Sequence, residues 1–182
     1  MTPLLTLSES VATHARTQPH KCGARDSLRQ LSYAQWHERA SRLANALLGL
    51  GLAKGDRVAL LAYNCIEWLE IYTALARAGL VAVPINFRLA GPEIAYIVQH
   101  AEARALIVQE PLRAVVEGVR AELPVPAANW VHFGGEATPA GWRSYEALMA
   151  AAPASPPVVA APTGAPAASV APDDLFALMY TS

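Results

Sequence analysis

The feature of this sequence that most constrains its fold is an alternation between helix-length amphipathic segments and short apolar runs. Apolar residues recur every three or four positions over 33–48, which is the spacing that buries one face of a helix. Apolar runs of strand length lie at 57–63, 80–86, 104–109 and 129–133, and helix-length segments separate them. Strands that alternate with helices predict an α/β fold, with a mainly parallel sheet and helices on both of its faces.

Local signals predict where individual helices begin and end. Ser32 and Gln35 have the spacing of a capping box, in which each side chain satisfies a backbone N–H at the start of a helix. Asn64 and Glu67 have the same spacing, so they predict the cap of a second helix. That helix is expected to end at Gly79, because glycine readily adopts the left-handed conformation that follows a helix.

Other segments carry weaker signals. Residues 7–17 predict a leading helix, and 21–31 predict a small hairpin that turns at Asp26. Pro84 has no N–H to donate to a neighbouring strand, so we expect it at a strand end or a sheet edge. Residues 111–123 follow the strand at 104–109 and predict one further helix, with a proline at its first turn.

The composition changes over the last third of the sequence. Residues 150–172 are dominated by Ala and Pro and contain no charged side chain, which predicts an extended connector. A strand-like apolar run follows at 175–180, and the sequence stops two residues later. We therefore expect a shortened chain with a partial N-terminal domain at 1–149, a connector at 150–172 and a strand within 173–182.

Composition also excludes several classes of function. The 182 residues carry 14 Lys and Arg against 15 Asp and Glu, so the basic excess expected of a nucleic-acid-binding protein is missing. No run is long and apolar enough for a membrane-spanning helix, and the first residues lack the pattern of a signal peptide. Two cysteines are too few for a disulfide framework. We expect a cytoplasmic protein with reduced thiols, no nucleic-acid partner and no integral membrane segment.

General catalytic and metal-binding motifs are missing from the sequence. It contains no Walker A loop, no dinucleotide-binding glycine pattern, no nucleophile elbow and no zinc-protease helix. Cys65 lies in an expected turn and has no pattern of a catalytic thiol around it. The histidines share no metal-ligand spacing and are interpreted as surface or packing residues: His14, His20, His37, His100 and His132. No catalytic residue and no metal ligand is assigned.

An ordered series of segments resembles the start of the adenylate-forming enzymes, the AMP-dependent synthetase/ligase family that includes the acyl-CoA synthetases. The stretch that follows the predicted strand at 80–86 is closest to the acid–CoA ligase branch. The resemblance covers nearly the whole sequence except the connector. It rests on LSYAQW at 31–36, RASRLANALLGLGLAKGDRVALL at 39–61, NCIEW at 64–68, ARAGLVAVPIN at 76–86, and FRL with PEIAYI at 87–97.

The resemblance implies two candidate binding sites. The residues at 175–182 resemble the strand that enters the phosphate-binding loop of the family, which would place Tyr180, Thr181 and Ser182 at the phosphates of ATP. The competing interpretation is that these are polar residues at a frayed terminus. Arg88 follows the strand at 80–86, where a basic residue of the acid–CoA ligases meets a phosphate of coenzyme A. A solvated loop arginine is the equally weighted alternative.

The function implied by the resemblance is that of an ATP-dependent carboxylic acid–CoA ligase, of which this chain is the N-terminal part. The family converts a small-molecule carboxylic acid and ATP to an acyl-adenylate, and then to acyl-CoA and AMP. ATP, Mg²⁺ and coenzyme A are expected for the full-length protein only, so we expect this fragment to be inactive and to self-associate. An adenylation domain that loads a carrier protein, or a non-catalytic truncated product, are the alternatives.

Overall fold

The computed structural model describes residues 6–159 and 169–181, and its central feature is a five-stranded sheet. The strand order is β4-β3-β5-β6-β7, and every neighbouring pair is parallel. β4 forms one edge of the sheet. The strands are β3 (Arg57–Leu61), β4 (Val81–Ile85), β5 (Ala105–Gln109), β6 (Trp130–Phe133) and β7 (Arg143–Ser144).

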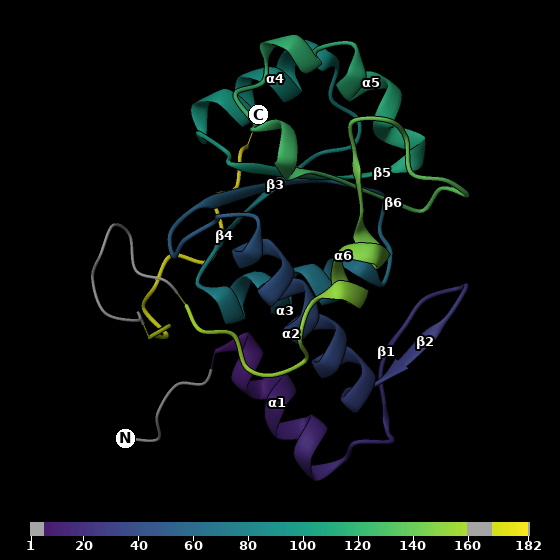
Figure 1. The fold of residues 1–182 in the computed structure, drawn as a ribbon, viewed down its shortest axis with the longest axis vertical. Helices are drawn as coiled ribbons and strands as arrows, with labels where there is room; N and C mark the ends of the chain where they lie inside the picture. The colour runs from purple at the N-terminus through teal and green to yellow at the C-terminus, as the bar shows by residue number, and fades with distance from the viewer. Residues whose placement is uncertain (1–5, 160–168, 182) are drawn as a thin grey trace.

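Helices cover both faces of this sheet (Figure 1). One face packs against α1 (Leu7–Thr17), α2 (Tyr33–Gly49), α3 (Glu67–Ala78) and α6 (Tyr145–Ala151). The other face packs against α4 (Gly91–His100), α5 (Arg113–Glu117) and the short 3₁₀ segment Glu110–Leu112. A second 3₁₀ segment, Arg120–Glu122, follows α5.

Alternate residues of each strand feed the two cores. Val58 and Leu60 of β3 lie in one core, whereas Ala59 and Leu61 lie in the other. All four side chains are fully buried, as expected for a parallel sheet that is covered on both faces. The expected α/β fold class is confirmed.

Several local predictions are confirmed as well. The Ser32–Gln35 capping box begins α2, with both reciprocal hydrogen bonds present. The leading helix is α1, and the hairpin consists of β1 (Cys22–Arg25) paired antiparallel with β2 (Gln30–Ser32). α3 ends at Gly79, whose φ of 67° is left-handed.

The predicted cap of α3 is wrong. Ile66 is the N-cap residue and makes no side-chain capping bond, so Asn64 does not cap the helix. Glu67 instead accepts a hydrogen bond from Arg29 Nη2 at 2.6 Å, an interaction with the β1–β2 hairpin that lies 38 residues earlier. A local capping signal was therefore overridden by an ion pair between distant segments.

The helix predicted over 111–123 is broken into short pieces. A 3₁₀ turn precedes α5, α5 ends at Gly118, and a second 3₁₀ turn follows. Two short elements further along were not predicted at all, the two-residue strand β7 and the seven-residue helix α6. In the described residues, no helix is long and apolar enough to cross a membrane.

The C-terminal segment, residues 169–181, follows the outer edge of β4 without forming the predicted strand over 175–180. Only Ala177 pairs, in a parallel bridge with Ala82. The Ala82 N–H donates to Phe176 O, and the Leu178 N–H donates to Ala82 O, both at 2.9 Å. Pro84 is the next residue of β4 that faces this edge and lacks an N–H, so the ladder cannot continue there. Pro84 at a sheet edge is as predicted.

A buried carboxylate, Glu70 of α3, ties several elements together. Its side chain is fully buried and receives hydrogen bonds from Arg39 Nε at 2.7 Å, Arg29 Nη2 at 3.1 Å and the Tyr145 hydroxyl at 2.8 Å. Arg39 also forms an ion pair at 2.6 Å with Glu146, whose side chain is largely exposed. This Glu70 network joins the hairpin, α2, α3 and α6.

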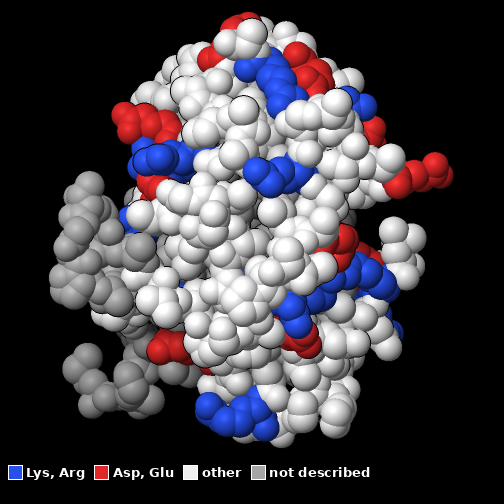
Figure 2. Space-filling model, viewed as in Figure 1, with Lys and Arg blue, Asp and Glu red and all other residues white. Residues whose placement is uncertain are grey.

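Many other charged side chains also pair with a side chain of opposite sign. On the face in Figure 2, acidic and basic side chains lie mostly beside one another and form no large area of one sign. Among the ion pairs of the molecule are Arg57–Glu102 at 2.7 Å and Arg113–Glu110 at 3.1 Å.

Candidate functional site

The strand order points to the carboxyl ends of the strands as the candidate site. From β3 the chain crosses to β4 on one side and then returns past β3 to β5 on the other, so the order reverses between β3 and β5. In open α/β sheets, ligands bind at the carboxyl ends of the strands at such a switch point. Here Tyr63 follows β3, Gln109 ends β5, and residues 86–88 follow the adjacent strand β4.

Side chains at these strand ends form a connected row that ends in Arg88. The Gln109 Oε1 accepts the Tyr63 backbone N–H at 2.8 Å, which ties the ends of β3 and β5 together. The Tyr63 ring meets the Phe87 ring edge-on at 4.9 Å between centroids. The Arg88 guanidinium lies over the Phe87 ring at 4.7 Å. The Asn86 Oδ1 accepts the Arg88 backbone N–H at 3.0 Å and fixes the turn.

The position of Arg88 suits an anion. The residue is exposed, and within residues 6–159 and 169–181 no carboxylate lies at ion-pair distance from it. A guanidinium presents several N–H donors in a planar fork, which matches the oxygens of a phosphate group. The cation–π contact with Phe87 restrains the side chain without using these donors.

The other predicted site residues lie along the C-terminal segment. The Tyr180 hydroxyl is within hydrogen-bond distance of His100 Nδ1, at 2.8 Å, and the two rings meet edge-on. Burial, followed by the nearby Tyr96 hydroxyl, raises the pKa of Tyr180, so it remains a neutral phenol. Thr181 is exposed, and Ser182 lies outside the described residues.

The structure does not bring Arg88 and Tyr180 together. α4 begins after β4 at the carboxyl edge of the sheet and ends at His100, so Tyr180 lies near the amino edge. There the Arg57 side chain, at the start of β3, donates to the Ala101 carbonyl at 2.6 Å. The two candidate binding sites therefore lie at opposite ends of the strands, Arg88 at the carboxyl ends and Tyr180 near the amino ends.

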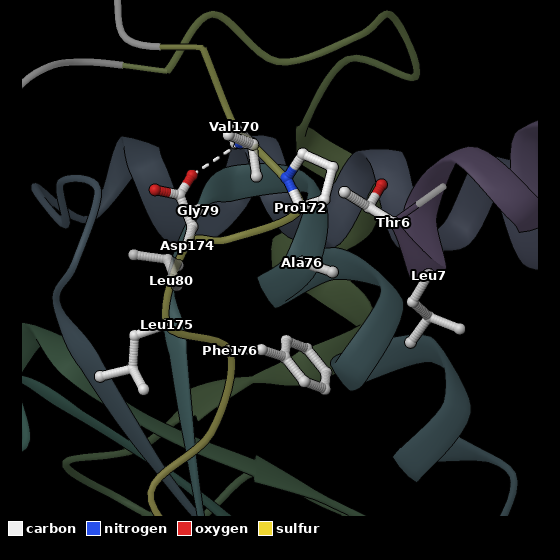
Figure 3. Close-up of a pocket in the computed structure, with 11 residues that line it drawn as sticks. Thr6, Leu7, Ala76, Gly79, Leu80, Val170, Pro172, Asp174, Leu175 and Phe176 are labelled. Carbon is white, nitrogen blue, oxygen red and sulfur yellow. Dashed lines mark hydrogen bonds between the residues drawn. The ribbon is translucent and has the colours of Figure 1, made fainter. Parts of the chain in front are cut away.

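The C-terminal segment is held to the domain before it reaches His100. Asp174 Oδ2 pairs with Lys54 Nζ at 2.7 Å. The same oxygen accepts the Ala171 backbone N–H at 2.7 Å (Figure 3). The Ala171 N–H and then Lys54 lower the pKa of Asp174. The Phe176 ring packs against Tyr72 of α3 at 5.6 Å.

A cavity of about 230 Å³ remains between this segment, the end of α3 and the start of α1 (Figure 3). Its walls are mostly apolar, with Leu7, Leu80 and Phe176 among them. The polar groups at its rim already have partners, since Thr6 caps α1 and Asp174 pairs with Lys54. The cavity therefore offers no converging charges for chemistry.

Two other titratable side chains, Cys65 and His132, have structural surroundings that do not favour catalysis. Burial, followed by Glu67, raises the pKa of the Cys65 thiol to about 12, which makes it a poor nucleophile. His132 is buried and pairs with Glu110. In the described part of the chain, no group of three or more His, Cys, Asp or Glu residues could hold a metal ion.

Sequence reasoning placed Arg88 directly after the strand at 80–86, as the structure has it, but did not identify the residues that contact it. Tyr63 and Gln109 each stand at the end of an apolar run, and that position was the only available signal. Their contact joins residues 46 positions apart, which no local pattern reveals. The partnership of Tyr180 with His100 spans 80 positions and was missed for the same reason.

The candidate residues differ in how well they fit the groups that the resemblance implies. Arg88, an exposed cation without a carboxylate partner in the described residues, fits a phosphate of coenzyme A. Thr181 is an exposed residue with a hydroxyl group, which is the kind of donor that a phosphate of ATP accepts from. The Tyr180 hydroxyl is already engaged by His100 and does not fit that role as the structure stands. The described residues supply no set of ligands for Mg²⁺.

Comparison with known proteins gives a consistent result. The chain is 34% identical over 153 residues to the long-chain-fatty-acid–CoA ligase FadD13 of Mycobacterium tuberculosis, covering 84% of this chain and 27% of that protein. It is 37% identical over 121 residues to the fatty acid–[acyl-carrier-protein] ligase ScoC of Streptomyces coeruleorubidus, covering 66% of this chain and 23% of ScoC. The chain thus spans about a quarter of the length of these relatives.

Solved structures show the same relationship. The anthranilate CoA ligase AuaEII, solved in complex with anthranoyl-AMP, superposes with a TM-score of 0.86 at 26% identity. The superposition covers 100% of this chain and 33% of AuaEII. The family model described as AMP-binding enzyme matches residues 11–182. From the parallel sheet to these matches, the observations agree that the chain belongs to the AMP-binding enzyme family, as an N-terminal part of the adenylate-forming fold.

Proposed function

We propose that this chain is the N-terminal part of an ATP-dependent carboxylic acid–CoA ligase, in which Arg88 contacts a phosphate of coenzyme A. The observation that carries the proposal is the exposed Arg88 guanidinium at the carboxyl edge of the sheet, next to the strand-order reversal. Its support by Phe87, Tyr63 and Gln109 adds to this, because a preorganised cation binds an anion at a lower entropic cost.

The proposed reaction has two halves. The acid carboxylate first displaces pyrophosphate from ATP, and the thiol of coenzyme A then displaces AMP to form the thioester. In the full-length enzyme, ATP would supply the adenylyl group and Mg²⁺ would offset the negative charge of its phosphates. Within this chain, Arg88 would bind and orient coenzyme A, and Thr181 and Ser182 would meet the phosphates of ATP. Tyr180 would join them only after leaving His100.

The substrate is proposed at the level of a small-molecule carboxylic acid. The names of the relatives include a long-chain fatty acid and anthranilate, which supports the class of acid and no particular member. Fatty acid metabolism in the cytoplasm is the proposed setting. The domain division proposed from the sequence is retained, with a partial domain at 1–149, a connector at 150–172 and the segment at 173–182.

The chain by itself is proposed to lack ligase activity and to self-associate. Exposed apolar side chains along the C-terminal segment, Leu175 at 57% and Met179 at 74% exposure, support self-association. Sedimentation velocity should show concentration-dependent oligomers of the wild-type chain. A Leu175→Ser, Met179→Ser variant should sediment as a monomer, whereas a monodisperse wild-type monomer would contradict the proposal.

The ligase assignment can be tested by acid-dependent exchange of labelled pyrophosphate into ATP. The full-length ligase should catalyse this exchange with at least one carboxylic acid from a panel of aliphatic and aromatic acids, whereas the 182-residue chain should not. Robust exchange by the chain alone would contradict its proposed inactivity. No exchange by the full-length protein with any acid would contradict the ligase assignment.

A carrier-loading adenylation enzyme is the second candidate, and the similarity to ScoC favours considering it. Both enzymes form an acyl-adenylate, so the second half-reaction separates them. Thioester formation with coenzyme A supports the first proposal. Transfer to a phosphopantetheinyl carrier protein without transfer to free coenzyme A supports the second.

A further inference from the structure

Arg77, in the last turn of α3, differs from the other buried or half-buried arginines of the molecule. It is partly buried, and in the described residues no carboxylate lies within ion-pair distance of it. The residues outside the description contain no Asp or Glu. Seven other arginines pair with carboxylates, namely Arg29, Arg39, Arg42, Arg57, Arg104, Arg113 and Arg120.

The Arg77 guanidinium forms hydrogen bonds with two residues of α2. Arg77 Nη2 is 2.9 Å from His37 Nδ1, and Nη1 contacts the Ser41 hydroxyl. The Ser41 hydroxyl donates to the His37 carbonyl at 2.7 Å, so it can accept from Arg77. Burial and the neighbouring Arg77 charge lower the pKa of His37, which keeps the imidazole neutral and able to accept. Both partners are neutral, so within the described residues the Arg77 charge is offset by the carboxyl end of α3 and is not paired with a carboxylate.

A groove of about 440 Å³ lies beside this cation. Arg77 and His37 form one part of its wall, and Ser8 and Glu9 of α1 form a polar rim. Glu9 is committed to the cap of α1, where its carboxylate receives the Thr6 N–H at 2.7 Å. The rest of the lining is apolar except for Ser169: Ala12, Pro156, Pro157, Val158, Val159, Ser169 and Val170.

We propose that this groove binds an amphipathic anion, with a carboxylate or phosphate head on Arg77 and an apolar tail along the Pro156–Val159 wall. A partly buried cation without a counter-ion is costly, and an anionic head offsets that cost while forming charge-assisted hydrogen bonds. The apolar wall contributes through burial of the tail. This site lies apart from Arg88 and Tyr180, and it does not depend on the proposed ligase function.

The proposal can be tested with octanoate and octyl phosphate as probes, and with octan-1-ol as the uncharged control. Titrations of the 182-residue chain, followed by NMR shifts of the Arg77 side chain and the His37 ring, should saturate with one or both anions. Shortening the tail from eight to six carbons should weaken binding about tenfold or slightly more, since each of the two lost methylenes contributes about 0.8 kcal/mol when buried. Octan-1-ol that binds as tightly as both anions would overturn the proposal.

Variants separate a binding role of Arg77 from a purely structural one. Arg77→Met should weaken anion binding about ten- to a hundredfold, as expected for loss of charge-assisted hydrogen bonds. Arg16→Met, an exposed arginine of α1 outside the groove lining, is the matched control and should bind normally. Unchanged anion affinity in a folded Arg77→Met protein would overturn the proposal.

A second pair of variants keeps the test valid if Arg77→Met does not fold. Val158 lines the groove and is 79% exposed, so substitution there leaves the cores intact. Val158→Asp should weaken anion binding more than the isosteric Val158→Asn, because the added carboxylate repels the head group. Equal anion affinity of these two variants would count against a charged ligand in the groove.

Discussion

Replacing Glu70 by Gln should destabilise the fold more than any other single change to a charged side chain. The Glu70 carboxylate has no exposed surface, and it accepts from Arg39, Arg29 and the Tyr145 hydroxyl. Glutamine has nearly the same volume but presents an NH₂ group toward donors that need an acceptor. Breaking a buried ion pair from one side costs about 3–5 kcal/mol.

The lower part of that range applies here. In Glu70→Gln, Arg29 retains its ion pair with Glu67 at 2.6 Å and Arg39 retains its ion pair with Glu146 at 2.6 Å. Neither cation is therefore left without a carboxylate partner. We therefore expect Glu70→Gln to lower the free energy of unfolding by about 3 kcal/mol, a large share of the roughly 5–15 kcal/mol of a typical domain. Urea denaturation followed by tryptophan fluorescence measures this change.

Glu146→Gln is the matched control, because Glu146 contacts the same Arg39 but its side chain is 63% exposed. Exposed ion pairs contribute about 0–1 kcal/mol, so this variant should unfold almost like the wild type. Tyr145→Phe should cost about 1.5–3 kcal/mol in the wild type and clearly less in Glu70→Gln, since the hydroxyl then loses its charged acceptor. Equal effects of Glu70→Gln and Glu146→Gln would refute the reasoning.

Three further predictions concern single groups. Iodoacetamide at pH 8 should label the exposed Cys22 quickly and Cys65 slowly, because burial raises the pKa of Cys65 to about 12; equal rates would contradict this. Arg113 lowers the pKa of Glu110 in the folded protein below its ordinary 4.5, so the unfolded chain binds a proton on Glu110 more readily than the folded one. The stabilisation from this carboxylate should be present above pH 4.5 and should fade as the pH falls below 4.5. Urea midpoints of the wild type and of Glu110→Gln, each at pH 7 and pH 3, measure this loss of stability. Gly79→Ala should lower stability by about 1 kcal/mol or more, because Gly79 has a φ of 67°, and an unchanged melting temperature would contradict the strain argument.

Much of the fold could be predicted because its signals are local. The Ser32–Gln35 capping box and the apolar spacing of α2 act within a few residues, and the apolar runs of the sheet need no distant information. Pro84 predicted a sheet edge, because a residue without an N–H cannot donate to a neighbouring strand in any context.

The errors arose where distant contacts decide the structure. Asn64 does not cap α3 because the chain there is set by the hairpin, where Asp26 accepts the Ile66 N–H at 3.1 Å and Arg29 pairs with Glu67. β7 and α6 were missed because two and seven residues are too few to show a periodic pattern. Their place is fixed by packing, with Tyr145 fully buried against the core.

The candidate site was predictable only in part. A residue that follows a parallel strand can be placed at the carboxyl end of that strand from sequence, which is why the place of Arg88 after β4 could be predicted. Its contact with Phe87 and the link from Tyr63 to Gln109 depend on the order of strands in the sheet, which the sequence pattern leaves open. For the same reason, the position of Tyr180 at the opposite edge from Arg88 was not foreseen.

The most direct measurement separates the two half-reactions of the proposed full-length ligase in an Arg88→Ala variant, with Arg16→Ala as the control. Pyrophosphate exchange should be unchanged, because it precedes the binding of coenzyme A. Thioester formation from pre-formed acyl-adenylate should require about ten- to a hundredfold more coenzyme A, as expected for loss of a charge-assisted phosphate contact. An equal loss in both half-reactions, or no loss in either, would contradict the role proposed for Arg88.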